Sequence, residues 1–336
     1  MCGIVAYIGQ REATPILTEG LKRLEYRGYD SAGIAVLKDG ELVIRRSVGR
    51  ISALEEKLDG LFDGVTIGMA HTRWATHGAP TECNAHPHCD ASGRMALVHN
   101  GIIENYRTLR TFLESKGIRL SSETDTEVLA KLVGHFYEGD IEEAVRRALR
   151  DVKGTFGITV LHADEPDRII AARRGSPLIV GVGKEEYVVA SDASAIIQHT
   201  PQVIYLADNE VACVTRKGFR TTNLDALPVT KEVEEVEWTL TQLELGEHQH
   251  FMAKEIFEQP EALRTCMRGR VDVADGRVIL GGLASVVREL ARCDRVILTG
   301  CGTAWHACLV GEFLIEDMAR IPCEVEYASE FRYRNP

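Results

Sequence analysis

The chain opens with Met1-Cys2-Gly3-Ile4-Val5, which places a cysteine directly behind the initiator methionine. A small second residue permits removal of Met1, and removal would leave Cys2 with both its thiol and a free α-amine. The amine, whose pKa is about 8 in an unperturbed chain, can take the proton of the thiol directly or through a water. Cys2 is therefore a candidate nucleophile that needs no separate histidine as its base. The alternative is a cysteine that stands here by chance.

Residues 3–220 have the pattern of one compact unit, which begins with an apolar strand at Ile4–Ile8 and an amphipathic helix at Arg11–Arg23. Further strands are predicted at 33–37, 42–47, 66–72 and 95–99, then helices at 104–116, 124–137 and 141–150, then strands at 156–161, 168–172, 178–182, 187–190 and 210–215. The Asp39-Gly40 pair predicts a tight turn between the second and third strands. Strands, then helices, then strands again indicate an α+β layered body, not strict β-α alternation.

The composition changes near Thr221, and we expect three regions. Residues 2–220 form the first domain, residues 221–247 an acidic connector with room for one strand, and residues 248–336 the start of a second domain. In the second domain a buried-type strand at 295–299 leads through Gly300-Cys301-Gly302-Thr303 into a helix that ends near residue 319. A strand at 324–327 completes a β-α-β unit.

The overall composition excludes several classes of protein. With a net charge of −11 over 336 residues, a nucleic-acid or anionic-membrane partner is not expected. No apolar run approaches the ~20 residues that cross a bilayer, and the N-terminus lacks the features of a secretory signal. Nine scattered cysteines without a Cys-x-x-Cys pair suit reduced thiols in a cytoplasm. We expect neither a metal nor a cofactor.

Three polar segments at predicted strand or helix ends carry the chemistry. Arg73 is a natural clamp for a carboxylate, and the neighbouring Trp74 can cover a small pocket. Asn100-Gly101 can supply an amide and a backbone N–H to an oxyanion. Asp125, in the first turn of a helix that Ser122 or Thr124 would cap, can hold an ammonium group. Each segment alone could be an ordinary surface loop, turn or helix start. Together with Cys2, the three segments indicate glutamine as substrate and ammonia as product.

Polar and glycine-containing motifs run the length of the chain: Cys2–Val5, Leu24–Gly33, His71–Gly78, Asn84–His88, His99–Asn105, Ser122–Glu127, Lys254–Pro260 and Gly300–Thr303. In these motifs the chain resembles the family of glutamine–fructose-6-phosphate aminotransferases (isomerising), or glucosamine-6-phosphate synthases. Other amidotransferases with an N-terminal nucleophile share the first-half motifs in weaker form. The Tyr26–Ser31, Lys254–Pro260 and Cys301–Thr303 blocks are more specific to this family.

The resemblance implies a four-layer αββα N-terminal-nucleophile hydrolase sandwich, followed by an incomplete α/β unit of the sugar isomerase (SIS) type. It implies Cys2 as nucleophile and Asn100 with Gly101 as the oxyanion hole. Glutamine would be bound by Arg73, Trp74, Thr76, His77 and Asp125. Tyr29 would belong to a closing loop, and Trp74 to a second loop that gates ammonia. Gly302 and Thr303 would contact the sugar phosphate of fructose 6-phosphate. The full-length enzyme would be a homodimer that makes glucosamine 6-phosphate, in hexosamine biosynthesis.

Two departures from the family pattern bear on the second half. Ala304 stands where the family has a serine after Cys-Gly-Thr, which removes one hydroxyl from the expected sugar-phosphate loop. The chain also ends at Pro336, whereas the family's isomerase half continues. We therefore expect a fragment that hydrolyses glutamine without a working synthase half.

Three competing interpretations remain open at this stage. Cys83, His86, His88 and Cys89 could surround zinc, but their spacing matches no common zinc pattern. A different amidotransferase with the same glutaminase head, of the phosphoribosyl-pyrophosphate or asparagine-forming type, is the nearest rival. The third interpretation is a non-catalytic module that senses glutamine or a sugar phosphate.

Overall fold

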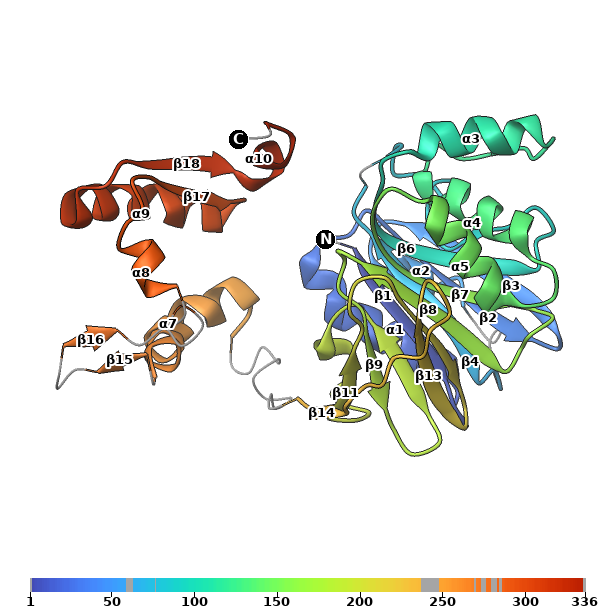
Figure 1. Ribbon diagram of the computed structural model, residues 1–336. Coiled ribbons are helices and arrows are strands. Elements are labelled where there is room, and N and C mark those ends of the chain that lie inside the picture. The colour runs from blue at the N-terminus through green and yellow to red at the C-terminus, as the bar shows by residue number, and fades with distance from the viewer. Residues whose placement is uncertain are drawn as a thin grey trace. The chain divides into compact units, whose positions relative to one another are not determined.

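The computed structural model describes residues 2–58, 63–75, 77–236, 248–268, 270–272, 276–278, 283 and 286–334. The chain divides into two compact units, Met1–Glu244 and Leu245–Pro336. In Figure 1 the first unit is coloured blue to yellow and the second orange to red. The segments with Cys2, Arg73, Asn100 and Asp125 all belong to the first unit.

In its described part, the first unit holds two β-sheets. One contains β1 (Gly3–Ile8), β2 (Ser31–Lys38), β3 (Glu41–Val48), β4 (Ile67–Arg73), β9 (Ile179–Val182), β10 (Tyr187–Ala190), β11 (Gln202–Tyr205) and β14 (Glu234–Glu235), in the order β14-β11-β9-β10-β1-β4-β2-β3. The other contains β5 (His88–Cys89), β6 (Met95–Ile103), β7 (Gly154–His162), β8 (Arg168–Arg174), β12 (Glu210–Thr215) and β13 (Gly218–Asn223), in the order β13-β12-β8-β7-β6-β5.

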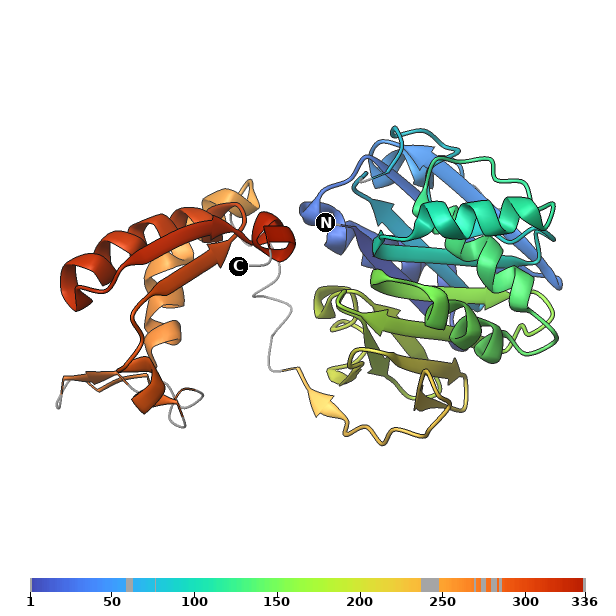
Figure 2. The same cartoon turned by 45° about the horizontal axis from the view of Figure 1, so that its top comes forward.

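Helices cover the outer face of each sheet. The larger sheet packs against α1 (Ala13–Leu24) and α2 (Ile51–Glu55). The smaller sheet packs against α3 (Tyr106–Ser115), α4 (Asp125–Phe136) and α5 (Ile141–Asp151), which lie across it in Figure 2. Between the two sheets lies a third apolar core. The expected four-layer αββα sandwich is thus confirmed.

Strand β1 shows why the N-terminal run is apolar throughout. Side chains alternate across a strand, so Ile4, Ala6 and Ile8 enter the core between the sheets. Val5 and Tyr7 enter the core under α1 and α2. All five are fully buried, and burial of each isoleucine or valine contributes about 1.5–3 kcal/mol. A strand buried on both faces fixes the position of the residue that precedes it, Cys2.

The pairing of β1 brings distant segments to Cys2. β1 lies antiparallel to β4, with Gly3 opposite Thr72 and Ile4 opposite His71. Its other neighbour is β10, with Val5 opposite Ala190. The start of β1 therefore lies beside the end of β4, where the His71–Gly78 motif begins.

Most of the predicted elements of the first unit are present. The Asp39-Gly40 turn joins β2 to β3, and both residues have positive φ angles, 52° and 80°. Thr124 rather than Ser122 caps α4, because its Oγ1 accepts the N–H of Glu127 at 3.1 Å. The elements that the sequence pattern did not indicate are the short helix α2 and the strands β5, β11 and β13.

The segment after Thr221 begins inside the first unit. Thr221–Asn223 complete β13, which pairs with β12. The two residues of β14 pair with β11, with Gln202 opposite Glu235. The bounds of the first unit, Met1–Glu244, contain this acidic stretch up to Glu244.

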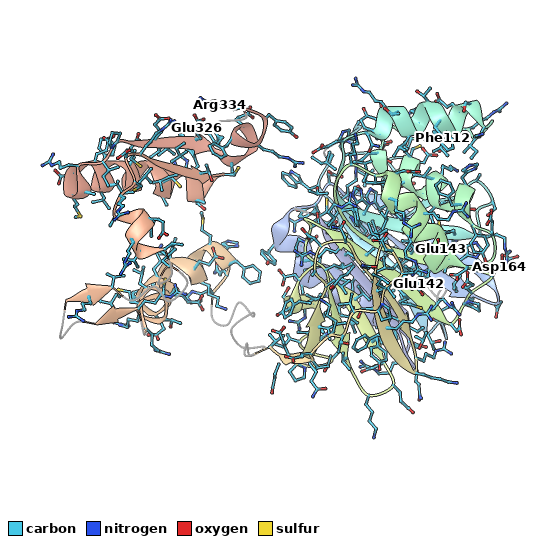
Figure 3. All side chains as sticks on the ribbon, viewed as in Figure 1. Phe112, Glu142, Glu143, Asp164, Glu326 and Arg334 are labelled. Atoms are coloured by element: carbon cyan, nitrogen blue, oxygen red, sulfur yellow. The ribbon has the colours of Figure 1, made fainter. Side chains whose placement is uncertain are left out.

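The described part of the second unit contains a parallel β-α-β element. Strands β17 (Val296–Gly300) and β18 (Cys323–Tyr327) pair in parallel and are joined by α9 (Thr303–Ala319). Preceding them are α7 (Phe251–Met267), β15 (Val271–Asp272), β16 (Arg277–Val278) and α8 (Val287–Leu290). Following them is α10 (Ala328–Arg334), whose Arg334 forms an ion pair with Glu326 of β18 (Figure 3). In the part of the chain that is described, no helix has the length and apolarity needed to cross a bilayer.

Candidate functional site

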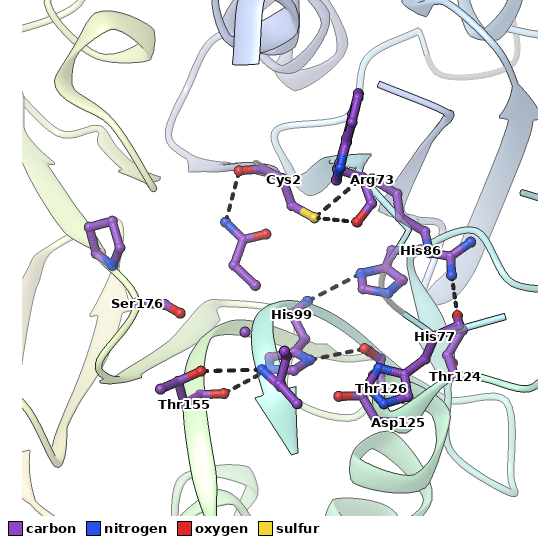
Figure 4. A pocket seen from close by; sticks show the side chains of 15 residues that line it. Cys2, Arg73, His77, His86, His99, Thr124, Asp125, Thr126, Thr155 and Ser176 are labelled. Atoms are coloured by element: carbon purple, nitrogen blue, oxygen red, sulfur yellow. Dashed lines mark hydrogen bonds and ion pairs between the residues drawn. The ribbon is translucent and has the colours of Figure 1, made fainter. Parts of the chain in front are cut away.

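A pocket of about 400 Å³ opens at the end of the sandwich where β1 begins and β4 and β6 end (Figure 4). Seven of the residues expected at the site line it together, namely Cys2, Arg73, Trp74, His77, Asn100, Gly101 and Asp125. They come from the starts of β1 and α4, from β6, and from β4 with the loop after it. The fold therefore assembles most of the predicted glutaminase centre. Thr76, also expected here, lies outside the described residues.

The thiol of Cys2 is partly buried and contacts the backbone of Trp74. Its Sγ accepts the N–H of Trp74 at 3.1 Å and lies 3.5 Å from the Trp74 carbonyl oxygen. Burial raises the pKa of the Cys2 thiol, and the Trp74 hydrogen bond opposes that effect. The resting group is a protonated thiol at neutral pH, so nucleophilic attack requires a base.

Asn100 and Gly101 lie directly opposite Cys2. The Nδ2 of Asn100 donates to the Cys2 carbonyl oxygen at 3.2 Å, an interaction drawn beside Cys2 in Figure 4. Gly101 has a φ of +132°, and a Cβ at this position would lie 2.2 Å from the carbonyl oxygen of Thr155. Only glycine fits there. The N–H of Gly101, next to Asn100, therefore has no side chain beside it that could obstruct the pocket.

Arg73 is buried and holds the loop that follows β4. Its Nη1 donates to the carbonyl oxygen of Ala79 at 3.3 Å, and its Nη2 to those of Gly78, at 3.1 Å, and His77. Among the described residues, these carbonyls account for three of its five N–H groups. The guanidinium thus has a structural task in shaping the pocket wall, besides the carboxylate binding that the sequence predicts.

Asp125 presents one carboxylate oxygen to the fold and the other to the pocket side. The buried Oδ2 accepts the N–H of Ile103 at 2.8 Å. The Oδ1 lies 4.0 Å from Nδ1 of His77, whose ring meets Tyr106 edge-on at 5.1 Å. Asp125 is the first residue of α4, where the helix dipole favours a negative charge. This fixed anion is suited to an ammonium group.

Trp74 and Tyr29 occupy two loops near the mouth of the site. The Trp74 side chain is 54% exposed, although its backbone N–H is engaged with the thiol. Tyr29 is partly buried, and the guanidinium of Arg50 lies 5.4 Å from the centre of its ring. Between them, Asp30 accepts the N–H of Ala75 and thereby joins the two loops.

Four histidines beneath the pocket were not anticipated as a group. His71, His86, His88 and His99 are all buried, and the His71 and His86 ring centres are 4.1 Å apart. Burial lowers the pKa of His71 and of His88 to about 3 and that of His86 well below its usual value. These rings are therefore neutral at physiological pH. No group of three or more His, Cys, Asp or Glu among the described residues could hold a metal ion.

A further wall of the pocket comes from the chain after β8. Ser176 and Pro177 line it, together with Thr155 of β7. No local sequence signal marks these residues, because only the pairing of the smaller sheet brings them to the pocket. The Gly175-Ser176-Pro177 turn reads in sequence as an ordinary loop.

Gly302 and Thr303 belong to the second unit. Gly302 precedes α9 with a φ of +59°, and its carbonyl oxygen accepts the N–H of His306 at 3.2 Å. Thr303 and the following Ala304 are exposed at the start of α9. Neither residue is among those that line the pocket of the first unit.

Comparisons with known proteins agree with this geometry. A family model described as a glutamine amidotransferase domain matches residues 71–198, and one described as a SIS domain matches residues 289–336. Glutamine–fructose-6-phosphate aminotransferase (isomerizing) of Chlorobaculum tepidum is 52% identical over 343 aligned positions, which cover 100% of this chain and 56% of that protein. The enzymes of the same name from Bacteroides thetaiotaomicron and Thermus thermophilus are 49% and 50% identical, covering 100% of this chain and 56% and 55% of theirs.

The chain belongs to the glutamine–fructose-6-phosphate aminotransferase family. It spans just over half the length of these curated relatives.

A solved structure supports the fold of the first unit of this family member. Glutamine phosphoribosylpyrophosphate amidotransferase from B. subtilis, complexed with ADP and GMP, aligns with a TM-score of 0.58 and 27% identity. The alignment covers 66% of this chain and 49% of that one. The sandwich is therefore that of the amidotransferases with an N-terminal nucleophile, as expected, and the SIS match agrees with the β-α-β element around α9.

Proposed function

We propose that the first unit is a glutaminase in which Cys2 is the nucleophile. The Cys2 sulfur attacks the side-chain carboxamide carbon of glutamine, and a C–S bond forms. Ammonia leaves as the C–N bond breaks, its extra proton coming from the thiol. Water then attacks the γ-glutamyl thioester and releases glutamate and the free thiol. The base is the α-amine of Cys2, exposed when Met1 is removed.

The pocket residues have complementary tasks in this reaction. Asn100 Nδ2 and the Gly101 N–H stabilise the oxyanion of the tetrahedral intermediate, an effect worth about 2.7–4 kcal/mol for one donor. Asp125 holds the α-ammonium group of glutamine, with His77 beside it. Arg73 holds the α-carboxylate, Thr76 is a further glutamine-binding residue, and Trp74 and Tyr29 close over the bound substrate.

One observation carries the proposal: the Asn100 Nδ2 lies 3.2 Å from the carbonyl oxygen of the residue whose thiol faces the same pocket. A protein that only binds glutamine has little use for a nucleophile and an oxyanion donor that two different sheets hold next to each other. This arrangement therefore favours catalysis over the non-catalytic sensing module.

For the whole protein we propose the reaction named for its relatives. Ammonia released at Cys2 would convert fructose 6-phosphate to glucosamine 6-phosphate in a sugar isomerase domain, of which the second unit is the start. Gly302 and Thr303 would contact the sugar phosphate, with one hydroxyl fewer because of Ala304. We further propose a cytoplasmic, homodimeric full-length enzyme of hexosamine biosynthesis. The domain limits would be 2–220 and 248–336, joined by 221–247, and within this connector the end of β13 and the strand β14 pair with strands of the first unit.

The glutaminase proposal is tested by glutamate release from glutamine. Wild type should turn over, Cys2→Ala should not, and Cys83→Ala, which removes an exposed thiol, should match wild type. A glutamine analogue with a diazoketone in place of the carboxamide should label Cys2 with a stoichiometry of one. Turnover that persists in Cys2→Ala would end the proposal. Intact mass should show that the active fraction lacks Met1.

The sensing module and the other amidotransferases give different results. A sensor would bind glutamine with no release of glutamate, whatever the state of Met1. In the full-length protein, fructose 6-phosphate should be the acceptor that yields an aminated product. Amination of phosphoribosyl pyrophosphate or aspartate instead would favour the rival type.

A further inference from the structure

His71 is a fully buried residue of β4 that faces the smaller sheet. Its Nε2 lies 3.0 Å from Asn100 Oδ1 and 3.1 Å from the carbonyl oxygen of His99. His71 belongs to the sheet of Cys2, with Ile4 opposite it, whereas Asn100 belongs to β6 of the other sheet. The hydrogen bond therefore crosses the core and ties the strand with the oxyanion donor to the strand beside the nucleophile.

The tautomer of His71 follows from its surroundings. Both atoms that face Nε2 are oxygens that only accept, so Nε2 carries the proton. Nδ1 is buried and has no hydrogen-bond partner among the described residues. An unprotonated nitrogen tolerates that position against the His86 ring better than an N–H would. The charged ring is disfavoured as well, since burial lowers the pKa of His71 to about 3.

The same contacts decide which way the Asn100 amide points. With Oδ1 toward His71, the amide nitrogen donates to the Cys2 carbonyl oxygen at 3.2 Å. A flipped amide would set Oδ1 against that carbonyl oxygen, where two acceptors repel. It would also place an N–H against Nε2 of His71 and force the proton onto buried Nδ1. Both ends of the amide therefore select one orientation.

We propose that His71 is a positioning residue, which fixes the Asn100 side chain so that its Nδ2–H groups face Cys2 and the pocket. One N–H donates to the Cys2 carbonyl oxygen, and the second is held ready for the oxyanion. The inference rests on the proposed glutaminase function, because it assigns His71 a task in that reaction. Its structural part, the tautomer, can be tested without any turnover.

The first experiment is ¹⁵N NMR of the protein with ¹⁵N-labelled histidine, in which His71 is assigned by difference from His71→Gln. The expected result is one neutral tautomer with the proton on Nε2, unchanged between about pH 5 and pH 8. A proton on Nδ1, or titration within this range, would overturn the inference. Because this readout needs no activity, it stands even if glutamine hydrolysis is never detected.

The second experiment compares two substitutions in glutamine hydrolysis. His71→Phe fills the space without a donor, so kcat should fall on the order of 100-fold, with KM changed less than about threefold. His71→Gln keeps an N–H donor and should recover most of the loss. A kcat for His71→Phe equal to wild type would refute the proposal, as would a His71→Gln no better than His71→Phe.

A double variant separates positioning from a general loss of structure. If His71 acts only through Asn100, then Asn100→Ala and the combination of Asn100→Ala with His71→Phe should have equal kcat values. A further large fall in the combination would show that His71 supports the site by another route. If the glutaminase proposal itself is wrong, the result is different: wild type would then be as inactive as Cys2→Ala.

Discussion

The indole of Trp74 rests on the backbone of Gly28: a Cβ built on Gly28 would lie 2.4 Å from Cε3 of that ring. Gly28 also has a φ of +111°, a conformation that residues with a side chain rarely adopt. The N–H of Trp74 contacts the Cys2 sulfur at 3.1 Å. The absence of a side chain at Gly28, which leaves room for the Trp74 ring, therefore influences the surroundings of the nucleophile. The loops at Gly28 and Trp74 are far apart in sequence but form one wall.

Substitution of Gly28 by alanine should therefore impair glutamine hydrolysis. The new methyl group displaces the Trp74 ring, and this shift weakens the hydrogen bond from the backbone N–H of Trp74 to the Cys2 sulfur. We therefore expect kcat/KM to fall about tenfold, equivalent to about 1.4 kcal/mol. The matched control is Gly93→Ala, with a φ of +74° and no atom within 4 Å of the new Cβ. It should lose about 1 kcal/mol of stability at unchanged kcat/KM. Equal kinetics for the two variants would contradict this account.

Two adjacent carboxylates on α5 should differ sharply in their effect on stability (Figure 3). The Glu142 side chain is 1% exposed and accepts from Arg146 Nη1 at 2.5 Å and from Arg220. Glu142→Gln leaves the 9% exposed guanidinium of Arg146 without its buried counter-charge, which costs about 3–5 kcal/mol. Glu143 is 40% exposed at 3.0 Å from Arg146 Nε, so Glu143→Gln should cost less than about 1 kcal/mol.

Urea unfolding of the two variants measures this difference directly. Both substitutions keep the shape of the side chain, so packing changes little. Similar midpoints for Glu142→Gln and Glu143→Gln would show that the buried pair contributes no more than the exposed one.

The raised pKa of the Cys2 thiol predicts how it reacts with iodoacetamide. Burial is the main cause, and only the thiolate reacts. The alkylation rate of Cys2 should therefore keep rising beyond pH 9, past the value of about 8.5 for a free cysteine. Peptide-resolved mass spectrometry distinguishes Cys2 from the exposed Cys83, Cys266 and Cys301. A Cys2 rate that levels off below about pH 8 would contradict the burial argument.

The parts of the fold that the sequence predicts are those with a strong local cause. Asp39-Gly40 marks a hairpin because its backbone angles suit few other pairs, and Thr124 marks a helix start because its hydroxyl accepts a free N–H. Strands β11 and β13 lack such a cause. They are short and partly exposed, and only their neighbours β9 and β12 define them.

The candidate site divides in a similar way. Cys2 and Asn100 could be predicted because each is a polar residue at the end of an apolar run, and Asp125 because it stands in the first turn of a helix with a clear capping residue. The bond from His71 to Asn100 could not be predicted, since it joins two sheets. Nor could the bonds from Arg73 to the carbonyl oxygens of its own loop, because they depend on how that loop folds back.

The buried histidines give the first unit a predictable dependence on pH. Burial lowers the pKa of each of the four rings, His71, His86, His88 and His99. Arg46 and Arg73 oppose protonation at His88, while Glu127 favours it. With a folded-state value of about 3 for His71 and His88 and about 6.5 when unfolded, the unfolded chain binds more protons between these limits. Stability is then present above about pH 6.5 and is lost as the pH falls toward 3.

Between pH 7.5 and pH 5, His71 and His88 should each cost the fold about 2 kcal/mol. At pH 5 the carboxylates contribute little to this difference. For Glu127, burial raises the pKa, but hydrogen bonds from Ser121 and Ser122 outweigh burial and leave the pKa below its usual value. The stability that the Glu127 carboxylate contributes is therefore lost mainly below about pH 4.5. Urea unfolding at the two pH values should show this loss for wild type and a loss about 2 kcal/mol smaller for His88→Gln. Substitution of the exposed His250 by glutamine should leave the wild-type difference unchanged. Equal unfolding free energies at pH 7.5 and pH 5 would contradict this account, because protonation of these rings would then not destabilise the folded state.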